Sequence, residues 1–179
     1  MKSIYTFYFL IITIISFAQK REIPAEIIMM NGDTIRTEII VQVNMFNTDV
    51  INELSLINSV KLVHDFNKKT KIPAKEIKKL VFKDKNTEKV FVNDGKKLKE
   101  MIYENILKCY IYYMANSYDG SKIAQFEFYD ENGKEVRNLK KAVKEKPELV
   151  ELINNSKLSS YATIRFVLKK YEDDYLTKK

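Results

Sequence analysis

The sequence is poor in the residues from which most catalytic and metal sites are built. Its 179 residues include one histidine, one cysteine and no tryptophan. A Ser-His-Asp triad has to use His64, and Asp65 is too close along the same strand to orient the imidazole from its own face. One histidine and one cysteine also cannot supply the usual zinc ligand sets. The sequence therefore favours an ordinary half-buried role for His64 and predicts no catalytic, metal-binding or cofactor-binding set.

Glycine is scarce as well. The four glycines stand at positions 32, 95, 120 and 133, each within an expected turn. Loops that hold phosphate need several glycines, because backbone amides must approach the ligand closely. The pattern therefore argues against nucleotide binding of that kind.

A lone cysteine cannot close an internal disulfide. Cys109 lies in the apolar stretch 107–111, which favours a small buried side chain, with a reactive or intermolecular thiol as the alternative. An exported chain without a disulfide framework is typical of a bacterial periplasmic or surface protein.

The longest uncharged apolar stretch lies at the start of the chain. Lys2 is followed by 14 such residues, 4–17, a layout typical of a secretory signal peptide. Signal peptidase requires small side chains one and three residues before the cut, and Ser16 and Ala18 provide them. We therefore expect residues 1–18 to be removed by cleavage between Ala18 and Gln19.

The alternative to cleavage is a retained membrane anchor. A helix needs about 20 apolar residues to cross a hydrocarbon core about 30 Å thick. The 14 residues available fall short of that length, and no later stretch approaches it. We expect no membrane span in the mature chain.

The composition of the chain suits a packed core. It is 45% hydrophobic and 12% aromatic, which argues against disorder. Residues 19–179 are of a length typical of one domain. We expect a single α+β domain, mainly β over 19–137 and mainly helical over 138–179.

Turn-bounded segments predict an antiparallel β-rich body with several hairpins. Residues 23–44 form one hairpin around Asn31-Gly32, a pair that supplies the two positive-φ positions of a tight turn. Residues 56–66 predict a further strand.

A proline interrupts the strand pattern of the next segment, residues 71–77. Pro73 cannot donate to a central ladder, so we expect a turn or helical loop over 71–77. Strand character resumes at 79–83 and, after a turn at 84–88, at 89–92.

The stretch 98–114 fits two patterns. Its apolar residues can be threaded on a helix, but β-branched and aromatic residues at 110–113 favour a strand over 106–114. Alternation at 122–129, followed by Asn132-Gly133, predicts another hairpin.

The final third changes character. A short basic helix is expected over 139–146, and Pro147 opens a second one, as proline does in a first helical turn. Ser160 can cap a last helix that runs to about residue 177. The apolar side chains of that helix recur at the spacing of one buried stripe: Ile164, Val167, Leu168, Tyr171 and Tyr175. The fold class is α+β, an antiparallel β-rich body followed by two or three packed C-terminal helices.

Several of these local features resemble those of small, uncharacterised exported proteins of Gram-negative bacteria. The likeness rests on the signal ending at 16–19, the hairpin at 30–35, the loop at 71–77, the Lys-Pro-Glu-Leu at 146–149 and the helix at 161–175. It spans most of the mature chain, but its motifs are turns and caps. The resemblance implies export and carries over no functional residue.

Positive charge is concentrated in one third of the chain. Residues 67–99 carry 12 basic and 4 acidic residues, against a net charge of +7 for the whole chain. A basic face attracts anions such as phospholipid headgroups or acidic polysaccharide, and export disfavours nucleic acid. The candidate anion-binding residues are Lys68, Lys69, Lys71, Lys75, Lys78 and Lys79.

An ordinary solvated surface explains the same lysines and is the favoured interpretation. Exposed lysines guard strand edges against aggregation. Arginine, which binds phosphate bidentately, occurs only at positions 21, 36, 137 and 165.

Carboxylates provide the one enzymatic alternative. Glu104, Asp119 and Glu127 are candidates for a pair acting on glycans, a chemistry that needs two carboxyls about 5–10 Å apart. Residues 130–134 are similar to a calcium loop, but a lysine stands at one ligand position, so we expect a hairpin turn. The acidic cluster 172–174 is expected to be solvated helix surface.

The leading hypothesis is a non-enzymatic binding or structural protein, exported to the periplasm or the outer cell surface, with an envelope protein or anionic envelope polymer as partner. A cell-envelope enzyme acting on glycans is one alternative. A protein that binds anionic surfaces through residues 68–99 is the other.

Overall fold

The computed structural model describes residues 19–44, 47–63, 70–156 and 161–177. Several sequence-based predictions lie outside these ranges: the leader with Ala18, the role of His64, the candidates Lys68 and Lys69, and the Ser160 cap. Gln19, on the other side of the expected cleavage site, is described and exposed.

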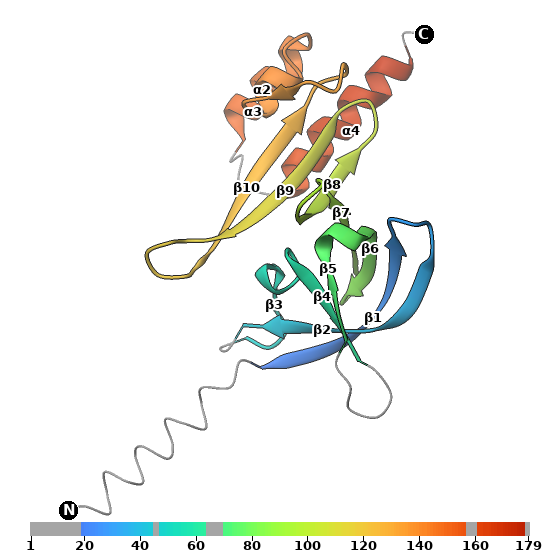
Figure 1. Cartoon of the computed structure of the whole chain (residues 1–179). Helices are drawn as coiled ribbons and strands as arrows, with labels where there is room; N and C mark the ends of the chain where they lie inside the picture. The colour runs from blue at the N-terminus through green and yellow to red at the C-terminus, as the bar shows by residue number, and fades with distance from the viewer. Residues whose placement is uncertain (1–18, 45–46, 64–69, 157–160, 178–179) are drawn as a thin grey trace, which may run out of the picture.

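Within the described residues, eleven strands form one antiparallel sheet and three α-helices follow it (Figure 1). This confirms an α+β fold with a β-rich body and C-terminal helices. The path through the sheet is β11-β10-β9-β8-β7-β6-β1-β2-β4-β5, with β3 paired to β2. The elements are β1 (Lys20–Met29), β2 (Thr34–Val43), β3 (Ile51–Asn52), η1 (Glu53–Ser55), β4 (Ser59–Leu62), β5 (Thr70–Pro73), η2 (Ala74–Glu76), β6 (Ile77–Asp84), β7 (Thr87–Asn93), β8 (Leu98–Glu104), β9 (Lys108–Ala115), β10 (Lys122–Tyr129), β11 (Glu135–Val136), α2 (Leu139–Ala142), α3 (Pro147–Asn155) and α4 (Tyr161–Leu176).

Strands β1–β6 form what we call the N-terminal lobe. Their order is β6-β1-β2-β4-β5, and the 3-10 turn η2 joins β5 directly back to β6, so the strands curl round a common interior (Figure 1). Alternation along β1 turns Ile23, Ala25 and Ile27 into that interior. Elements β7–α4 form the C-terminal lobe.

The first hairpin is confirmed, but its turn differs from the expected one. The last strand pair is Ile28 with Thr34, and Gly32 donates to the carbonyl of Met29 at 3.1 Å. Gly32 alone of the Asn-Gly pair has a positive φ, +95°. The loop is longer than two residues, and such a loop needs only one left-handed position, after its β-turn.

The strand expected at 56–66 is shorter in the structure. Asn52 caps the 3-10 turn η1 by accepting a hydrogen bond from the Leu54 amide, and strand pairing begins only at Ser59. Leu56 and Ile57 are buried although neither belongs to a strand. Their hydrophobicity reflects burial in a turn, which the alternation pattern cannot separate from a strand.

The turn or helical loop predicted over 71–77 is confirmed only for Ala74–Glu76, and the prediction is wrong for 71–73, which belong to a strand. Strand β5 lies at the end of the sheet, Pro73 is its last residue, and η2 follows. An edge position tolerates proline because no neighbouring strand needs its missing N–H.

The strand favoured at 106–114 is confirmed as β9 with slightly shifted bounds, and the helical alternative is wrong, because residues 98–104 form a second strand, β8. β8 and β9 pair as a hairpin around Asn105, whose amide donates to the Leu107 carbonyl. Strand β8 was missed because its apolar spacing also fits a helix, and cross-strand pairing decides between the two.

The helices follow the predicted order, with one shorter than expected. α2 ends at Ala142, where the C-cap residue Val143 has φ −110° and ψ 20°, outside the helical region, and Lys146, which precedes Pro147, is non-helical as well. Pro147 opens α3, and the buried side of α4 consists of Ile164, Val167, Leu168 and Tyr171, with Tyr175 partly buried beside them.

The apolar sides of the helices and of both lobes contribute to one hydrophobic cluster. None of the helices in the described ranges has the length and apolar character needed to cross a bilayer.

Candidate functional site

Strands β8, β9 and β10 have two chemically different faces. Cys109, Ile111 and Tyr113 of β9 are buried on the face where the helices lie (Figure 1). The alternate residues point the other way, and register places Tyr110 opposite Glu127 and Lys108 opposite Tyr129. We call this second side the open face; it carries Lys97, Lys99, Glu104, Lys108, Tyr110, Tyr112, Glu127 and Tyr129.

On the helix side, six polar side chains from both lobes meet; we call them the junction network: Glu53, Lys89, Glu100, Tyr113, Lys122 and Tyr161. The Lys89 ammonium lies 2.9 Å from Oε1 of Glu53 and 3.1 Å from Oε2 of Glu100. Glu53 and Glu100 are only 6% and 5% exposed. One cation thus joins two buried carboxylates that come from different lobes.

Further hydrogen bonds complete the junction network. Lys122 donates to the second carboxylate oxygen of Glu53. Tyr113 donates to Oε2 of Glu100 at 2.6 Å, and its hydroxyl lies 3.2 Å from that of Tyr161. Among the described residues, no fully buried side-chain nitrogen or oxygen lacks a partner.

The electrostatics of the junction network hold its groups in fixed protonation states. Burial acts to raise the pKa of Glu53, but hydrogen bonds from Lys122 and Lys89 bring it below its ordinary value. Burial acts to lower the pKa of Lys89, but the charge of Glu100 and the bond to Glu53 raise it. Burial, with the charge of Glu100, strongly raises the pKa of Tyr113. None of these three groups is placed to exchange a proton near neutral pH, where a general acid or base works best.

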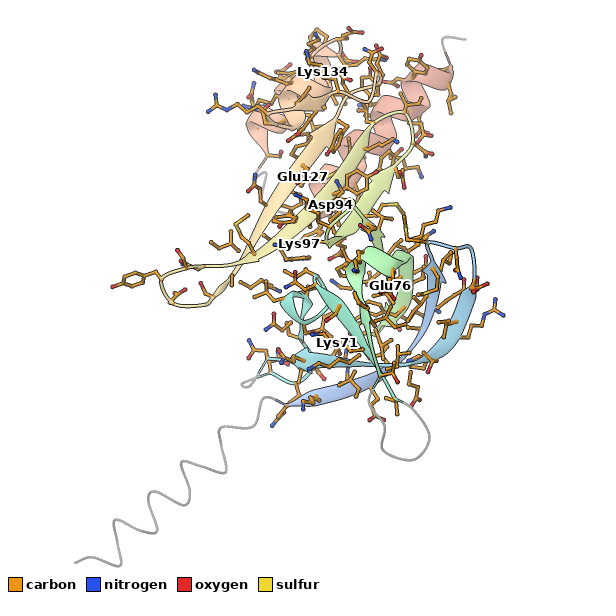
Figure 2. All side chains as sticks on the ribbon, in the orientation of Figure 1. Lys71, Glu76, Asp94, Lys97, Glu127 and Lys134 are labelled. Atoms are coloured by element: carbon orange, nitrogen blue, oxygen red, sulfur yellow. The ribbon has the colours of Figure 1, made fainter. Side chains whose placement is uncertain are left out.

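On the open face lies a pocket of about 510 Å³, which we call the open-face pocket. Eight of its ten lining residues have hydrogen-bonding side chains, among them Asp94 from the loop after β7 and Glu104 at the end of β8. Figure 2 shows Asp94 and Glu127 near the middle of the molecule, where the two lobes meet. Gly133, in the turn after β10, lines the pocket as well.

Lys99 organises the floor of the pocket. Its ammonium lies 3.0 Å from Oε2 of Glu127, 4.4 Å from the ring centre of Tyr110 and 5.4 Å from that of Tyr129. The two rings meet edge to face at 5.8 Å. Burial acts to lower the pKa of Lys99, but the hydrogen bond and charge of Glu127 raise it. The chain's own lysine therefore occupies an aromatic and acidic cage of the kind that binds ammonium groups.

Glu104 forms the second polar pair of the pocket. Its Oε1 accepts a hydrogen bond from the Tyr110 hydroxyl at 2.8 Å and lies 3.7 Å from the Lys108 ammonium. Burial raises the pKa of Tyr110, and the bond to Glu104 adds to the effect. Both side chains of the Glu104–Lys108 pair are about two-fifths exposed, so a ligand in the pocket can reach them.

The structure brings together two of the three carboxylates singled out from the sequence. Glu104 and Glu127 line the same pocket, whereas Asp119 lies on the exposed loop between β9 and β10 and accepts from the Ser121 amide. Asp119 thus does not join the pocket.

The candidate anion-binding lysines that the structure describes come from three different elements. Lys71 lies on β5 and Lys75 on η2, and Lys78 and Lys79 lie on β6 at a register shift between the buried Ile77 and Leu80. Lys71 does lie directly opposite Lys61 of β4, and both are exposed. Not all lysines of residues 67–99 are at the surface, because the side chains of Lys89 and Lys99 are largely buried and are paired with carboxylates.

Two smaller predictions are confirmed. Cys109 is fully buried, and burial raises the pKa of its thiol to about 12. Asp130 accepts from the amides of Asn132 and Lys134 in a hairpin turn.

The prediction that 172–174 is solvated helix surface is wrong for Glu172, which accepts hydrogen bonds from Tyr103 and Asn105. The helix is anchored there to the turn between β8 and β9. Spacing along α4 alone could not show that another element lies against this side.

Sequence reasoning missed the junction network, although a signal for it exists. Lys89 stands two residues before the buried Phe91, and Glu100 stands between Leu98 and Ile102, which are both buried. A period of two places each charged residue on the buried face of its strand. A charge at a core position is a signal for a partnered buried group.

No family model matches the chain, and neither does any curated protein or any solved structure.

Proposed function

We propose that the chain is an exported, non-enzymatic binding protein of the cell envelope, periplasmic or surface-associated, and that the open-face pocket is its ligand site. The observation that carries the proposal is the contrast between two polar clusters on one sheet. The two carboxylates of the junction network are buried and paired, whereas the open-face pocket presents the Glu104–Lys108 pair to solvent.

The proton affinities of the buried groups support binding rather than catalysis. Glu53, Lys89 and Tyr113 are all shifted away from neutrality, each in the direction that keeps its present protonation state. Cys109 is shifted in the same sense, so its thiol is a poor nucleophile. Acid-base and thiol chemistry both need the opposite shift.

Export is supported by the leader-like composition of residues 1–18. Amino-terminal sequencing of the protein recovered from the cell envelope should give a chain that begins at Gln19. An intact Met1 on material retained in the cytosol contradicts export.

The binding role is tested with hydrogen exchange. Adding the small-molecule fraction of an envelope extract should slow amide exchange in β9 and β10, which supply four of the ten lining residues of the open-face pocket, and leave β2 unchanged. Equal exchange with and without the extract contradicts the proposed ligand site.

A cell-envelope enzyme is the second candidate, favoured by one observation: Glu104 and Glu127 line the same pocket. Such an enzyme should turn over a glycan substrate and lose that activity in Glu104→Gln or Glu127→Gln, because each carboxylate has its own role. The exposed Glu151→Gln is the matched control. A screen with glycosidase substrates that detects no turnover supports the binding protein.

A third candidate, attachment to anionic surfaces, is favoured by the exposed, cross-strand Lys61–Lys71 pair. Binding to vesicles of anionic phospholipid should then weaken with added salt and in Lys71→Gln, since exposed charges are screened. Salt-independent attachment contradicts this mode.

A further inference from the structure

We infer that the open-face pocket binds a neutral, hydroxyl-rich ligand, one or two sugar rings of a glycan. This inference rests on the proposed function and names the class of ligand that the pocket recognises.

Both ammoniums of the pocket already have a carboxylate partner. Lys99 is paired with Glu127 and Lys108 with Glu104. The third carboxylate, Asp94, accepts from the backbone amides of Lys96 and Lys97, and these bonds, against the effect of burial, lower its pKa. An anionic ligand would give up its hydration without finding an unpaired ammonium, which makes its binding costly. The carboxylates are engaged by lysines or by backbone amides, so the pocket favours a ligand without net charge.

The hydrogen-bonding groups that remain suit hydroxyls. Each carboxylate has more lone pairs than its present partners use, and each ammonium has three N–H donors. Glu104 and Lys108 offer both kinds of group at the mouth of the pocket, about two-fifths exposed. A sugar hydroxyl donates and accepts at once, so one hydroxyl can bridge such a pair.

Tyr129 supplies most of the exposed aromatic surface of the pocket. It is half-buried, whereas Tyr110, which lines the pocket too, is only 7% exposed and its ring faces the Lys99 ammonium. A tyrosine ring combines an apolar body with a polar tip, which matches a sugar ring with its C–H surface and rim of hydroxyls. The pocket volume of about 510 Å³ lies within the range of small-molecule sites, roughly 300–1,000 Å³.

Isothermal titration of the purified protein tests the class of ligand. The probes are maltotriose, cellotriose and triacetylchitotriose as neutral sugars, trigalacturonate as an acidic sugar, triglycine as a zwitterion, and inorganic phosphate. At least one neutral trisaccharide should bind with a Kd of about 1 mM or tighter. Its affinity should change little with salt, because no net charge is screened.

Variants assign the binding to the pocket. Tyr129→Ala should weaken the sugar about tenfold, and the milder Glu104→Gln should weaken it as well. Tyr118→Ala is the matched control, because Tyr118 is 96% exposed at the tip of the β9–β10 hairpin, outside the pocket. Both pocket variants should keep the wild-type circular dichroism spectrum.

The outcomes separate this inference from the proposed function. Preferential binding of trigalacturonate, triglycine or phosphate, lost in Tyr129→Ala, overturns the neutral-sugar class and leaves the site in place. Sugar binding that is equal in wild type, Tyr129→Ala and Glu104→Gln overturns the inference. If none of the neutral sugars binds, the inference fails, and exchange protection by envelope extract decides the proposed function separately.

Discussion

Lys99 and Glu100 are neighbours in β8, yet they belong to two different polar clusters. Lys99 lies in the open-face pocket, and Glu100 lies in the junction network on the opposite face of the same strand. Both clusters contain lysines, glutamates and tyrosines, and both include residues of β8, β9 and β10. The composition is the same, so the difference between them comes from access to water.

Burial changes what each ion pair does. In the junction network the carboxylates are almost fully desolvated, so removing one partner leaves a charge that water cannot reach. In the open-face pocket Glu104 and Lys108 keep part of their hydration, so their pairing contributes little to stability and can be exchanged for contacts with a ligand. One face of the sheet thus holds the lobes together, and the other carries the ligand site that we propose.

The largest effect is expected from Lys89→Met. The change leaves Glu53 and Glu100 buried without the ammonium that they share, so the free energy of unfolding should fall by about 3–5 kcal/mol. Urea unfolding followed by circular dichroism measures the difference. The exposed Lys78→Met serves as the control and should stay within about 0.5 kcal/mol of wild type. A similar loss in both variants contradicts the role given to Lys89.

A smaller effect is expected from removing one buried hydroxyl. Tyr113→Phe removes the hydroxyl that donates a hydrogen bond to Glu100 at 2.6 Å. Because a buried acceptor loses its partner, the free energy of unfolding should fall by about 1–3 kcal/mol. Tyr129→Phe in the pocket loses only contacts at 3.5 Å and should cost less than about 0.5 kcal/mol. Equal losses, measured by the same urea titration, contradict the contrast between the two faces.

Lys99→Met tests how much the ion pair on the floor of the open-face pocket contributes to stability. The variant loses a cation–π contact at 4.4 Å and the pairing with Glu127. Because the Glu127 side chain is 23% exposed, water can replace the ammonium, and the expected loss is about 1 kcal/mol. Thermal unfolding of the wild type, Lys99→Met and Lys89→Met should rank in that order. A Lys99→Met variant as unstable as Lys89→Met shows that the pocket is structural.

The sequence predicts some of this fold because local chemistry decides those parts. The Asn-Gly turns, Pro147 at the start of α3 and the buried stripe of α4 depend on a few neighbouring residues. The short β4 strand pairs with β2, more than twenty residues earlier in the chain, and the apolar spacing of β8 also fits a helix until its pairing with β9 is known. The same limit applies to the sites: Glu104 and Glu127 were singled out by residue type, but only the register of β8, β9 and β10 places them in one pocket.

The junction network was also not predicted, because charge was counted along the sequence and not for each face of the strands. Lys89 and Glu100 lie on the buried side of their strands, beside Phe91, Leu98 and Ile102. Five strand or turn segments and one helix supply its six residues, which are spread over positions 53 to 161 of the sequence. The alternation of β7 and β8 signals that a buried charge is present but does not name its partner.

The smallest expected effect is a change in the acid limb of stability. The junction network holds the pKa of Glu53 below its ordinary value of 4.5, so near pH 4 the unfolded chain binds more protons at this residue than the folded chain does. Its contribution to stability is therefore present above about pH 4.5 and declines as pH falls through the lower folded pKa. Urea titrations between neutral and acid pH should show a shallower loss of stability in Glu53→Gln than in wild type, whereas the exposed Glu151→Gln should follow wild type. If stability falls with pH in Glu53→Gln as steeply as in wild type, Glu53 has the same pKa in the folded and unfolded chains. In that case the junction network does not stabilise the charged form of this carboxylate.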